Sequence, residues 1–263
     1  MHEGLKGLIN KYFLKKPRLR RFITRLLEGD RDVTVNILGE PVRINTIKEH
    51  GYLRAARFMS SSSFLGDEMP VLLGIAYFLN GADAFVDVGS NVGVFCAVLG
   101  KFQRIRPIPI YAFEPNPDTY LRLLRTVAPL GAEVANIALS DREGVIEFVS
   151  GTVSHVFSAV KSGSEYVVHA PPVKVPCHRL DSLPIKGNRI FLKIDVEGHE
   201  SEVLRGAAQL FDEGRVFACY IDGFESQDIP SLLASKGFRL FDGRSLEERP
   251  KGDCYSLLAV NFK

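Results

Sequence analysis

A glycine-containing loop and an acidic residue that follows it are the first groups in the sequence that could bind a ligand together. The segment A-F-V-D-V-G-S-N-V-G-V-F at 84–95 is typical of a strand, a tight turn and the start of a helix. In open α/β sheets such a turn borders the ligand crevice, and Gly89 and Gly93 remove Cβ atoms where a ligand can approach the backbone. Glu114 ends the next strand-like segment, and its carboxylate can accept hydrogen bonds from both hydroxyls of a ribose.

The same loop disfavours a dinucleotide cofactor. Its glycines follow the pattern G-x-x-x-G, whereas dinucleotide-binding enzymes have G-x-G-x-x-G, so a nicotinamide oxidoreductase is not expected. Asp87 stands immediately before the loop, where a carboxylate would repel a pyrophosphate but would tolerate an amino-acid ammonium. S-Adenosylmethionine has a ribose, an adenine, an ammonium and a sulfonium, and it has no phosphate. We therefore expect this cofactor, with an ordinary strand–turn–helix unit as the alternative.

Further contacts to this cofactor are expected at two other places in the chain. Ser140 and Asp141 follow the third strand-like segment and could line an adenine pocket, with Asp141 accepting from the exocyclic amine; a simple Ser-Asp turn is the alternative. Glu68 precedes the first core helix and could bind the methionine ammonium or cap that helix. The full set of expected cofactor-binding residues is Asp87, Gly89, Ser90, Asn91, Gly93, Glu114, Ser140, Asp141 and Glu68.

A second acidic segment, L-K-I-D-V-E-G-H-E at 192–200, could carry out the chemistry. Strand alternation puts Lys193 and Asp195 on one face, and we expect Asp195, Glu197 and His199 to emerge together at the strand's carboxyl end. Transfer of the cofactor's methyl group needs alignment in a dry pocket and, for a protonated acceptor, removal of a proton, which a carboxylate or an imidazole can perform. We rank Asp195 first as the base, His199 second and Glu197 third. A pairing of Lys193 with Asp195 and a capped helix start are the structural alternatives.

The order and spacing of these motifs resemble the FkbM family of methyltransferases. The resemblance runs from about residue 65 to 225 and rests on D-V-G-S-N-V-G, F-E-P-N-P, A-L-S-D, L-D-S-L at 180–183, L-K-I-D-V-E-G-H-E and V-L-R-G-A at 203–207. It implies a Rossmann-like class I methyltransferase fold, with a seven-stranded, mostly parallel sheet whose last strand is antiparallel. It also implies S-adenosylmethionine as methyl donor and a hydroxyl on a sugar, polyketide or other natural product as the usual acceptor. The first 50 residues and the tail after 240 are not covered.

The acceptor side is expected to involve Asp222, Lys193 and His155. Asp222 ends the fifth strand-like segment, at a position where the FkbM pattern usually has Glu, and His155 lies in an inserted loop where a solvated histidine is the alternative. Some class I O-methyltransferases use a divalent ion to lower the pKa of the acceptor. Asp195, Glu197, His199 and Asp222 offer suitable atoms. Three ligands within five residues of one loop rarely all face one ion, so we do not favour a metal.

The elements that must position these residues alternate along the chain. Strands are predicted at 84–88, 109–113, 134–138, 190–194 and 216–221, and helices at 68–79, 92–101, 117–128, 200–211 and 229–236. Residues 238–241 and 255–262 read as a closing antiparallel pair, and 150–172 as an insertion between two short strands near the ligand face. Alternating strands and helices imply a mostly parallel sheet with helices on both faces.

The N-terminal region differs from the rest in charge. Residues 1–28 contain eight Lys or Arg and two Glu, a charge of +6; since the whole chain carries +2, the remainder sums to −4. Apolar residues recur there at helical spacing, and 34–38 with 41–44 predict a small hairpin around Gly39-Glu40. We divide the chain into a basic helical extension with the hairpin (1–50) and a methyltransferase domain (51–263). The extension either packs with a solvated basic face or makes a peripheral membrane contact.

Composition limits the remaining function classes. No apolar run reaches the length of a membrane-spanning helix, and the first residues lack a secretory signal. The four cysteines are far apart, which is typical of a reducing compartment, so we expect a cytoplasmic protein, at the inner membrane surface if the extension binds there. The chain has no Trp and lacks the N/D-P-P-Y/F motif, so nucleic acid is not expected as a partner. The sequence thus predicts an O-methyltransferase for a sugar, glycan or natural product; an N-methyltransferase and a non-catalytic binding module are the alternatives.

Overall fold

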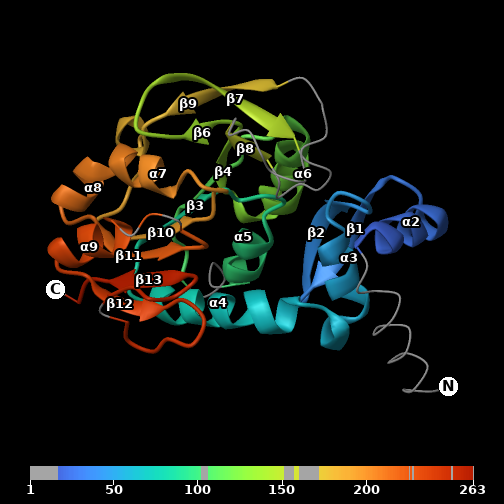
Figure 1. The fold of residues 1–263 in the computed structure, drawn as a ribbon, viewed down its shortest axis with the longest axis horizontal. Helices are drawn as coiled ribbons and strands as arrows, with labels where there is room; N and C mark the ends of the chain where they lie inside the picture. Colours follow the sequence, from blue (N-terminus) through green and yellow to red (C-terminus); the bar gives the residue numbers. More distant parts are fainter. Residues whose placement is uncertain are drawn as a thin grey trace.

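The protein is described here by a computed structural model, which covers residues 17–101, 106–150, 157–159, 172–224, 226, 228–249 and 251–262. Its centre is a seven-stranded sheet in the order β12-β13-β11-β10-β3-β4-β5 (Figure 1). The strands in this order are Arg239–Asp242, Leu257–Val260, Val216–Ile221, Ile190–Ile194, Ala84–Val88, Ile110–Phe113 and Glu133–Ala135. Neighbouring strands from β11 to β5 are parallel, while β13 is antiparallel to both β11 and β12. The predicted fold class is confirmed.

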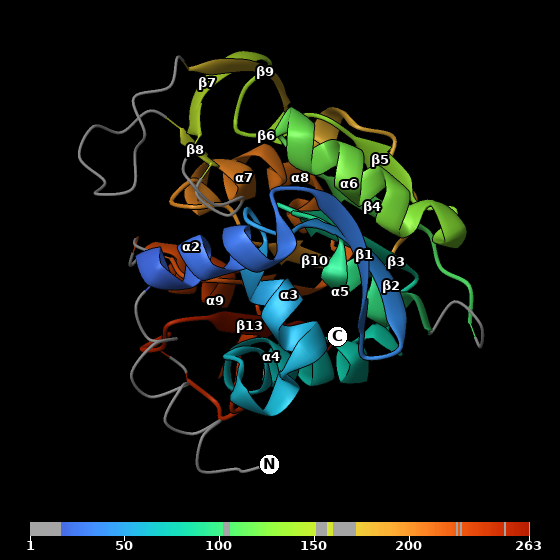
Figure 2. The same cartoon turned by 90° about the vertical axis from the view of Figure 1, so that its right-hand side faces the viewer.

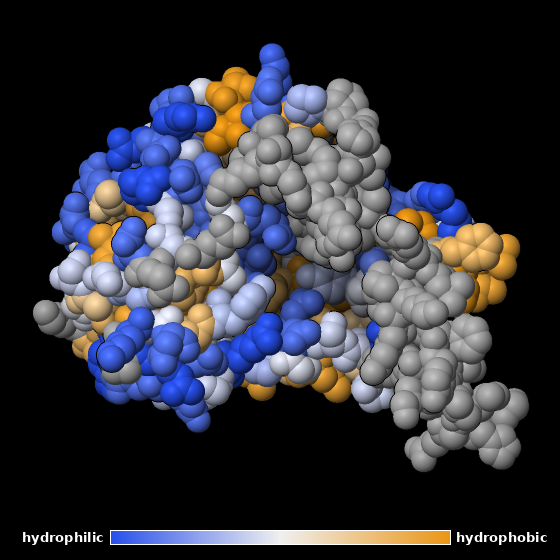
Figure 3. Space-filling model, in the orientation of Figure 1, coloured by the Kyte–Doolittle hydropathy of each residue, from blue (hydrophilic) through white to orange (hydrophobic). Residues whose placement is uncertain are grey.

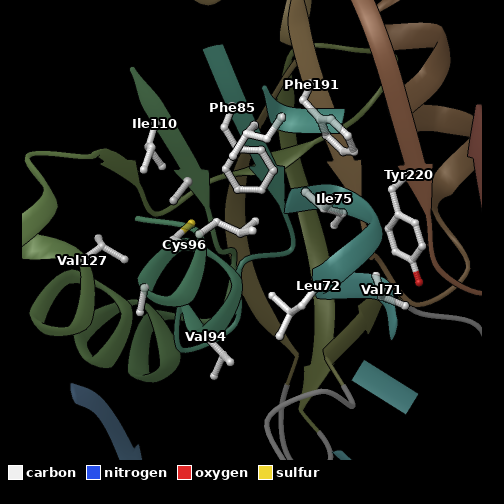
Figure 4. Packing of buried hydrophobic residues seen from close by; sticks show 14 of the residues in the cluster. Val71, Leu72, Ile75, Phe85, Val94, Cys96, Ile110, Val127, Phe191 and Tyr220 are labelled. Atoms are coloured by element: carbon white, nitrogen blue, oxygen red, sulfur yellow. The ribbon is translucent and has the colours of Figure 1, made fainter. Parts of the chain in front are cut away.

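Helices cover both faces of this sheet because its strands are apolar on both sides. One face packs against α4 (Phe64–Leu79), α5 (Val94–Leu99) and α6 (Pro117–Val127), and the other against α7 (Glu200–Gly206), α8 (Ala208–Asp212) and α9 (Asp228–Ser235). Alternate residues of a strand therefore enter different cores: Phe85 joins the first and Val86 the second. Figure 4 shows the first core, where Phe85 and Phe191 of the sheet lie near Ile75 of α4.

The N-terminal part shares the first core. It consists of α2 (Pro17–Glu28), the antiparallel strands β1 (Asp32–Ile37) and β2 (Glu40–Asn45), and α3 (His50–Arg57). The predicted hairpin is confirmed, although its turn is Leu38-Gly39 (φ 53° and 90°), one residue earlier than expected. Ile37, Val42 and Ile44 are fully buried in the core that also holds α5 and α6. The hairpin is thus fixed to the main sheet and does not form a separate core.

A smaller four-stranded sheet lies at one end of the molecule (Figure 1). It has the order β6-β9-β7-β8, formed by Ala138–Leu139, Val173–His178, Gly144–Ser150 and Phe157–Ala159. The third predicted strand, 134–138, is therefore wrong as one unit. The side-chain amide of Asn136 donates to the carbonyl oxygens of Glu114 (2.8 Å) and Pro115 (3.0 Å), where the chain leaves β5 and continues into β6. Most of the predicted insertion at 150–172 falls outside the described residues.

Other elements differ from prediction mainly at their ends. Helix α4 begins at Phe64, four residues before the predicted start, and continues through Pro70. The single helix predicted at 200–211 is divided into two helices, α7 and α8, because the backbone is not helical at Ala207 between them. Short 3₁₀ helices lie at Met59–Ser61, Ala128–Leu130 and Leu180–Ser182. Among the helices of the described ranges, none is long and apolar enough to cross a membrane.

Candidate active site

The glycine loop between β3 and α5 is held by hydrogen bonds to β4. The backbone N–H groups of Gly89 and Ser90 both donate to the carbonyl oxygen of Phe113, at 3.0 Å each. The Ser90 hydroxyl donates to the Asp87 carbonyl oxygen (2.7 Å) and accepts from the Phe113 N–H (3.1 Å). Gly89, Asn91 and a second glycine at 93 have φ of 77°, 49° and 82°. The Ser90 side chain thus stabilises the loop itself.

The two glycines are required by neighbouring protein atoms. A Cβ at Gly89 would collide with the carbonyl oxygen of Asp195, and one at Gly93 would lie 2.7 Å from Leu123 and 2.9 Å from Val127 of α6. The direction in which a Cβ would point is thus filled by protein at both positions, and contact of the loop backbone with a ligand stays a prediction. The glycines allow the loop to pack between the end of β10 and α6, which fixes the loop's position relative to Asp195.

Glu114 lies against this loop, as the motif spacing predicted. Its side chain is buried, and its Oε2 accepts from the Asn91 N–H while its Oε1 accepts from the Asn116 N–H, each at 2.9 Å. Asn116 also caps α6 by accepting from the N–H groups of residues 118 and 119. Burial raises the pKa of Glu114 to about 7, although the two backbone hydrogen bonds lower it. Each carboxylate oxygen has a further lone pair that can accept a hydrogen bond from a ligand hydroxyl.

A row of polar side chains crosses the sheet on the face that α4 and α5 cover. Lys193 of β10 stands opposite Asp87 of β3 and Tyr220 of β11 in the strand register. The Lys193 ammonium is 3.0 Å from Asp87 Oδ1, 3.3 Å from Asp195 Oδ2 and 4.8 Å from the centre of the Phe95 ring. Burial lowers the pKa of Lys193, but the two carboxylates raise it further, so the net shift is upward and the amine stays charged.

This pairing changes the role expected for Asp87 and Lys193. Asp87 is fully buried, and its second oxygen accepts from the Cys96 thiol at 3.2 Å. Its carboxylate therefore compensates Lys193, and we correct the expectation that it meets the ammonium of a ligand. Lys193 is 2% exposed, so its cation is enclosed and does not reach an acceptor. The alternative that Lys193 pairs with Asp195 is confirmed.

A cavity of about 400 Å³ lies where the carboxyl ends of β10 and β11 meet the N-terminal part. Its sheet side contains Asn91, Phe95, Asp195, Glu197, Tyr220, Asp222 and Arg244. Its other side, which we call the cover, contains Lys48, Glu49, His50, Gly51, Tyr52, Arg54, Ser62, Ser63, Phe64, Asp67, Glu68 and Val71, from the segment before α3 through the first turns of α4. Of the predicted site residues, the cavity brings together Asn91, Asp195, Glu197, Asp222 and Glu68.

Two oxygen atoms in the cavity wall are buried without a hydrogen-bond partner among the described residues. They are Oδ1 of Asn91 and Oε2 of Glu68. Burial raises the pKa of Glu68 to about 7, while a hydrogen bond with the Tyr52 hydroxyl lowers it. A buried acceptor without a partner costs free energy that a donor from a ligand would recover. These atoms therefore suit a bound group with several N–H donors, such as an ammonium.

Three carboxyl groups crowd the sheet side of the cavity. Asp195 has 41% of its side chain exposed, and Asp222 accepts from the Tyr220 hydroxyl at 2.6 Å. Desolvation and the charge of Asp195 raise the pKa of Asp222. Desolvation at the cavity wall, followed by the charges of Asp195 and neighbouring carboxylates, raises the pKa of Glu197 to about 7. Near neutral pH this wall can therefore bind a proton as well as a cation.

His199 and Ser140 contact each other and do not line the cavity. The chain turns at Gly198 (φ 81°), so that His199 begins α7 and its Nε2 lies 3.0 Å from the Ser140 hydroxyl. Asp141 beside it accepts from Arg205 at 3.1 Å. The prediction that His199 emerges together with Asp195 and Glu197 is wrong, because the turn directs it toward the end of β6. Lining of an adenine pocket by residues 140 and 141 stays a prediction.

Some residues of the cavity were not predicted, and one predicted residue cannot be placed. Sequence reasoning missed Tyr52 and Arg54 of α3, Tyr220 and Arg244; only the alternation of β11 signalled that Tyr220 shares a face with Lys193. His155 lies outside the described residues. Among the residues that the structure describes, no group of three or more His, Cys, Asp or Glu is arranged to hold a metal ion.

Comparison with known proteins gives the following similarities. A model of the methyltransferase FkbM domain matches residues 87–240. Hexuronic acid methyltransferase AglP of Haloferax volcanii is 29% identical over 163 residues, which are 58% of this chain and 62% of AglP. The crystal structure of methyltransferase FkbM from Methylobacillus flagellatus has a TM-score of 0.47 at 16% identity, covering 71% of this chain and 47% of that one. A TehB-like methyltransferase from Corynebacterium glutamicum gives a TM-score of 0.41 at 12% identity, with coverages of 80% and 96%.

Proposed function

The chain belongs to the FkbM methyltransferase family, and from this premise we propose that it uses S-adenosylmethionine to methylate a hydroxyl group of a sugar or glycan. The observation that carries the proposal is the position of Glu114. Its carboxylate is fixed at the end of β4 by two backbone N–H groups, one of them from Asn91 of the glycine loop. Asn91 lines the cavity that also holds Asp195, so Asn91 connects a carboxylate suited to ribose with the wall of candidate bases.

The residues at this edge of the sheet fit the cofactor group by group. Glu114 would accept from the ribose hydroxyls, because each of its oxygens keeps a lone pair after the backbone bonds are made. Asn91 Oδ1 and Glu68 Oε2, both buried without partners among the described residues, would accept from the ammonium. Ser140 and Asp141 would lie on the adenine side. When bound, the cofactor supplies a methyl group on a sulfonium, which is an excellent leaving group.

The remaining chemical task of the protein is to orient the acceptor and remove its hydroxyl proton. Asp195 is our first choice as base because it lines the cavity and Lys193 holds one of its oxygens at 3.3 Å, which limits the side chain to few rotamers. Glu197 is second, since a pKa of about 7 suits proton transfer near neutral pH. His199 is no longer among our candidates, because its ring contacts Ser140.

The cover supports an acceptor that carries a negative charge. Lys48 and Arg54 of the cover contribute cations opposite the acidic wall, and Arg244 contributes one from the sheet side. Lys48 also pairs with Asp118 at 2.7 Å, and Arg244 with Asp67 at 3.3 Å. The related AglP is named a hexuronic acid methyltransferase, and a hexuronic acid has a carboxylate that guanidinium groups bind well. The chain spans about 62% of AglP's length, and we propose the same acceptor class, a hexuronic acid residue of a glycan, for this protein.

Calorimetric titration with S-adenosylmethionine and S-adenosylhomocysteine tests the cofactor part of the proposal. We expect micromolar binding that Glu114→Ala weakens by about tenfold or more, the loss typical of a charge-assisted hydrogen bond. The matched control is Glu133→Ala, an exposed glutamate on neighbouring β5, which should leave binding unchanged. An absence of binding by the unmodified chain would overturn the proposal.

Mass spectrometry of reaction products tests the acceptor part. The chain is incubated with the cofactor and either a hexuronic acid glycoside or the corresponding neutral hexoside. We expect a mass gain of one methyl group, substituting a hydroxyl hydrogen, on the hexuronic acid glycoside and little on the hexoside. Equal methylation of both sugars would refute the charged-acceptor assignment while leaving the methyltransferase assignment in place.

A further inference from the structure

Helix α2 turns its apolar face away from the protein. Phe22, Leu26 and Leu27 share one side of this helix and are 65%, 74% and 75% exposed. In Figure 3 an apolar area lies where Figure 1 places α2, at the edge of the molecule. A helix on a globular protein normally buries its apolar side against the core. Within the part of the chain that the structure describes, this apolar side is exposed.

The polar side of the same helix is what holds it to the protein. The Glu28 carboxylate accepts a hydrogen bond from Arg57 of α3 and lies 3.7 Å from Arg31, with only 16% of its side chain exposed. Arg31 also donates to the Glu28 carbonyl oxygen at 2.9 Å. These contacts fix the rotation of α2 about its axis. The exposure of Phe22 and its neighbours is therefore a consequence of how the helix is attached.

The charge around the apolar face is strongly positive. Within α2 the sequence has four arginines, at 18, 20, 21 and 25, and one glutamate, and residues 1–28 as a whole carry +6. An apolar face on a helix whose sequence is this basic matches the interface of an anionic bilayer, where acyl chains cover the apolar side chains and lipid phosphates neutralise cations. A second copy of the chain would bring two positive surfaces together, which disfavours self-association through this face.

We propose that α2 docks this protein on membranes that contain anionic lipids, with Phe22, Leu26 and Leu27 inserted at the lipid–water interface. The placement also bears on the cavity. Helix α3, to which Glu28 is bound, carries Tyr52 and Arg54 of the cover, and Figure 2 shows α2 beside α3 on this side of the molecule. A docked α2 holds the cover close to the lipid surface. The inference goes beyond the proposed function and does not depend on it.

Vesicle co-sedimentation of the full chain tests the docking directly. Vesicles of phosphatidylcholine alone are compared with vesicles of equal parts phosphatidylglycerol and phosphatidylcholine. We expect binding to the mixed vesicles that falls as salt is raised, and weak binding to phosphatidylcholine alone. Leu26→Asp should weaken binding to mixed vesicles by about tenfold or more. The matched control is Leu73→Asp, because Leu73 on α4 is 64% exposed and lies outside the docking face.

A fluorescence measurement keeps the test independent of any folding defect. The chain contains no tryptophan, so Leu27→Trp introduces a single probe on the docking face and Leu73→Trp a single control probe. Anionic vesicles should shift the emission of the first variant to shorter wavelength and leave the second unchanged. No binding of the unmodified chain to mixed vesicles, or equal binding of Leu26→Asp, would overturn the proposal. Self-association that Leu26→Asp abolishes, without vesicle binding, would assign the face to a second copy instead. Because neither assay contains a methyl donor or acceptor, its result does not depend on whether the proposed function is correct.

Discussion

The ammonium of Lys193 lies 3.0 Å from the carboxylate of Asp87, although the two residues are 106 positions apart in the sequence. Both are completely enclosed by the first core, and the next residue on the same face of β10 is Asp195, in the cavity wall. The buried pair thus connects the strand that begins the glycine loop with the strand that carries the candidate base.

Removal of the buried cation should be strongly destabilising. Lys193→Met leaves Asp87 buried and uncompensated, so we expect the free energy of unfolding to fall by about 3–5 kcal/mol. Urea denaturation followed by circular dichroism measures it. Lys174→Met is the matched control, because Lys174 pairs with Glu147 at the surface, where such a pair contributes less than about 1 kcal/mol. Similar losses in both variants would contradict the role assigned to the buried pair.

Asp195 should be needed for turnover and not for cofactor binding. Asp195→Asn keeps the shape of the side chain and removes its basicity, so we expect kcat to fall by about 10²–10⁴ while the cofactor Kd changes only a few-fold. Steady-state kinetics with calorimetry separates the two effects. His199→Ala serves as comparison and should retain kcat within about tenfold, because His199 contacts Ser140. A larger loss in His199→Ala than in Asp195→Asn would reverse the assignment of the base.

The ligand-free protein should lose stability as the pH rises through 7. Burial raises the pKa of Glu68 to about 7 in the folded state from 4.5, so between these values the folded state binds more protons than the unfolded state. Stability from this group is therefore present below about pH 4.5 and is lost as pH rises to 7 and above, by about 3 kcal/mol. Urea denaturation between pH 5 and 8 measures the slope. Glu68→Gln, which can still accept from Tyr52, should reduce the slope, while Glu114 and Glu197, whose pKa values are also raised to about 7, keep the remainder. An unchanged slope in this variant would show that Glu68 titrates normally.

Gly89 should tolerate no side chain, whereas Gly198 should tolerate one at moderate cost. Both have left-handed backbones, with φ of 77° and 81°, but a Cβ at Gly89 would collide with the Asp195 carbonyl oxygen and one at Gly198 would meet nothing within 4 Å. Gly198→Ala then costs only the backbone strain, about 1–2 kcal/mol. Gly89→Ala adds the displacement of Asp195, so we expect a loss of about 3 kcal/mol or more together with most of the activity. Thermal unfolding and turnover of the two variants, compared side by side, distinguish steric contact from strain.

Local patterns were sufficient to predict the centre of the fold. The strands at 84–88, 190–194 and 216–221 are found at those residues because each is a short, mostly apolar run with at most one charged residue, which is typical of a buried parallel strand. Glu114 was predicted beside the glycine loop because the carboxyl ends of neighbouring parallel strands lie at the same edge of a sheet. These inferences use only the period of a strand and the order of parallel units.

Features that depend on tertiary contacts were not predictable in this way. The end of β5 depends on where the Asn136 amide finds its acceptors, and the direction of His199 depends on the turn at Gly198. The burial of Asp87 required the register between β3 and β10, which places Lys193 opposite it. Apart from Glu68, the cover could not be assigned to the cavity, because no local pattern shows that α3 and the start of α4 lie against the ends of β10 and β11.

The position of β13 has a consequence for how the molecule is made. It follows all the other described strands in the chain, yet it lies between β11 and β12 and not at the margin of the sheet. β11 and β12 can be synthesised before β13 is available to pair with them. Until then, the backbone N–H and C=O groups that each of them directs toward β13 have no hydrogen-bond partner in the sheet. Residues 257–260 supply these partners. A chain without residues 257–260 in place would expose these two strand edges, which other chains could pair with.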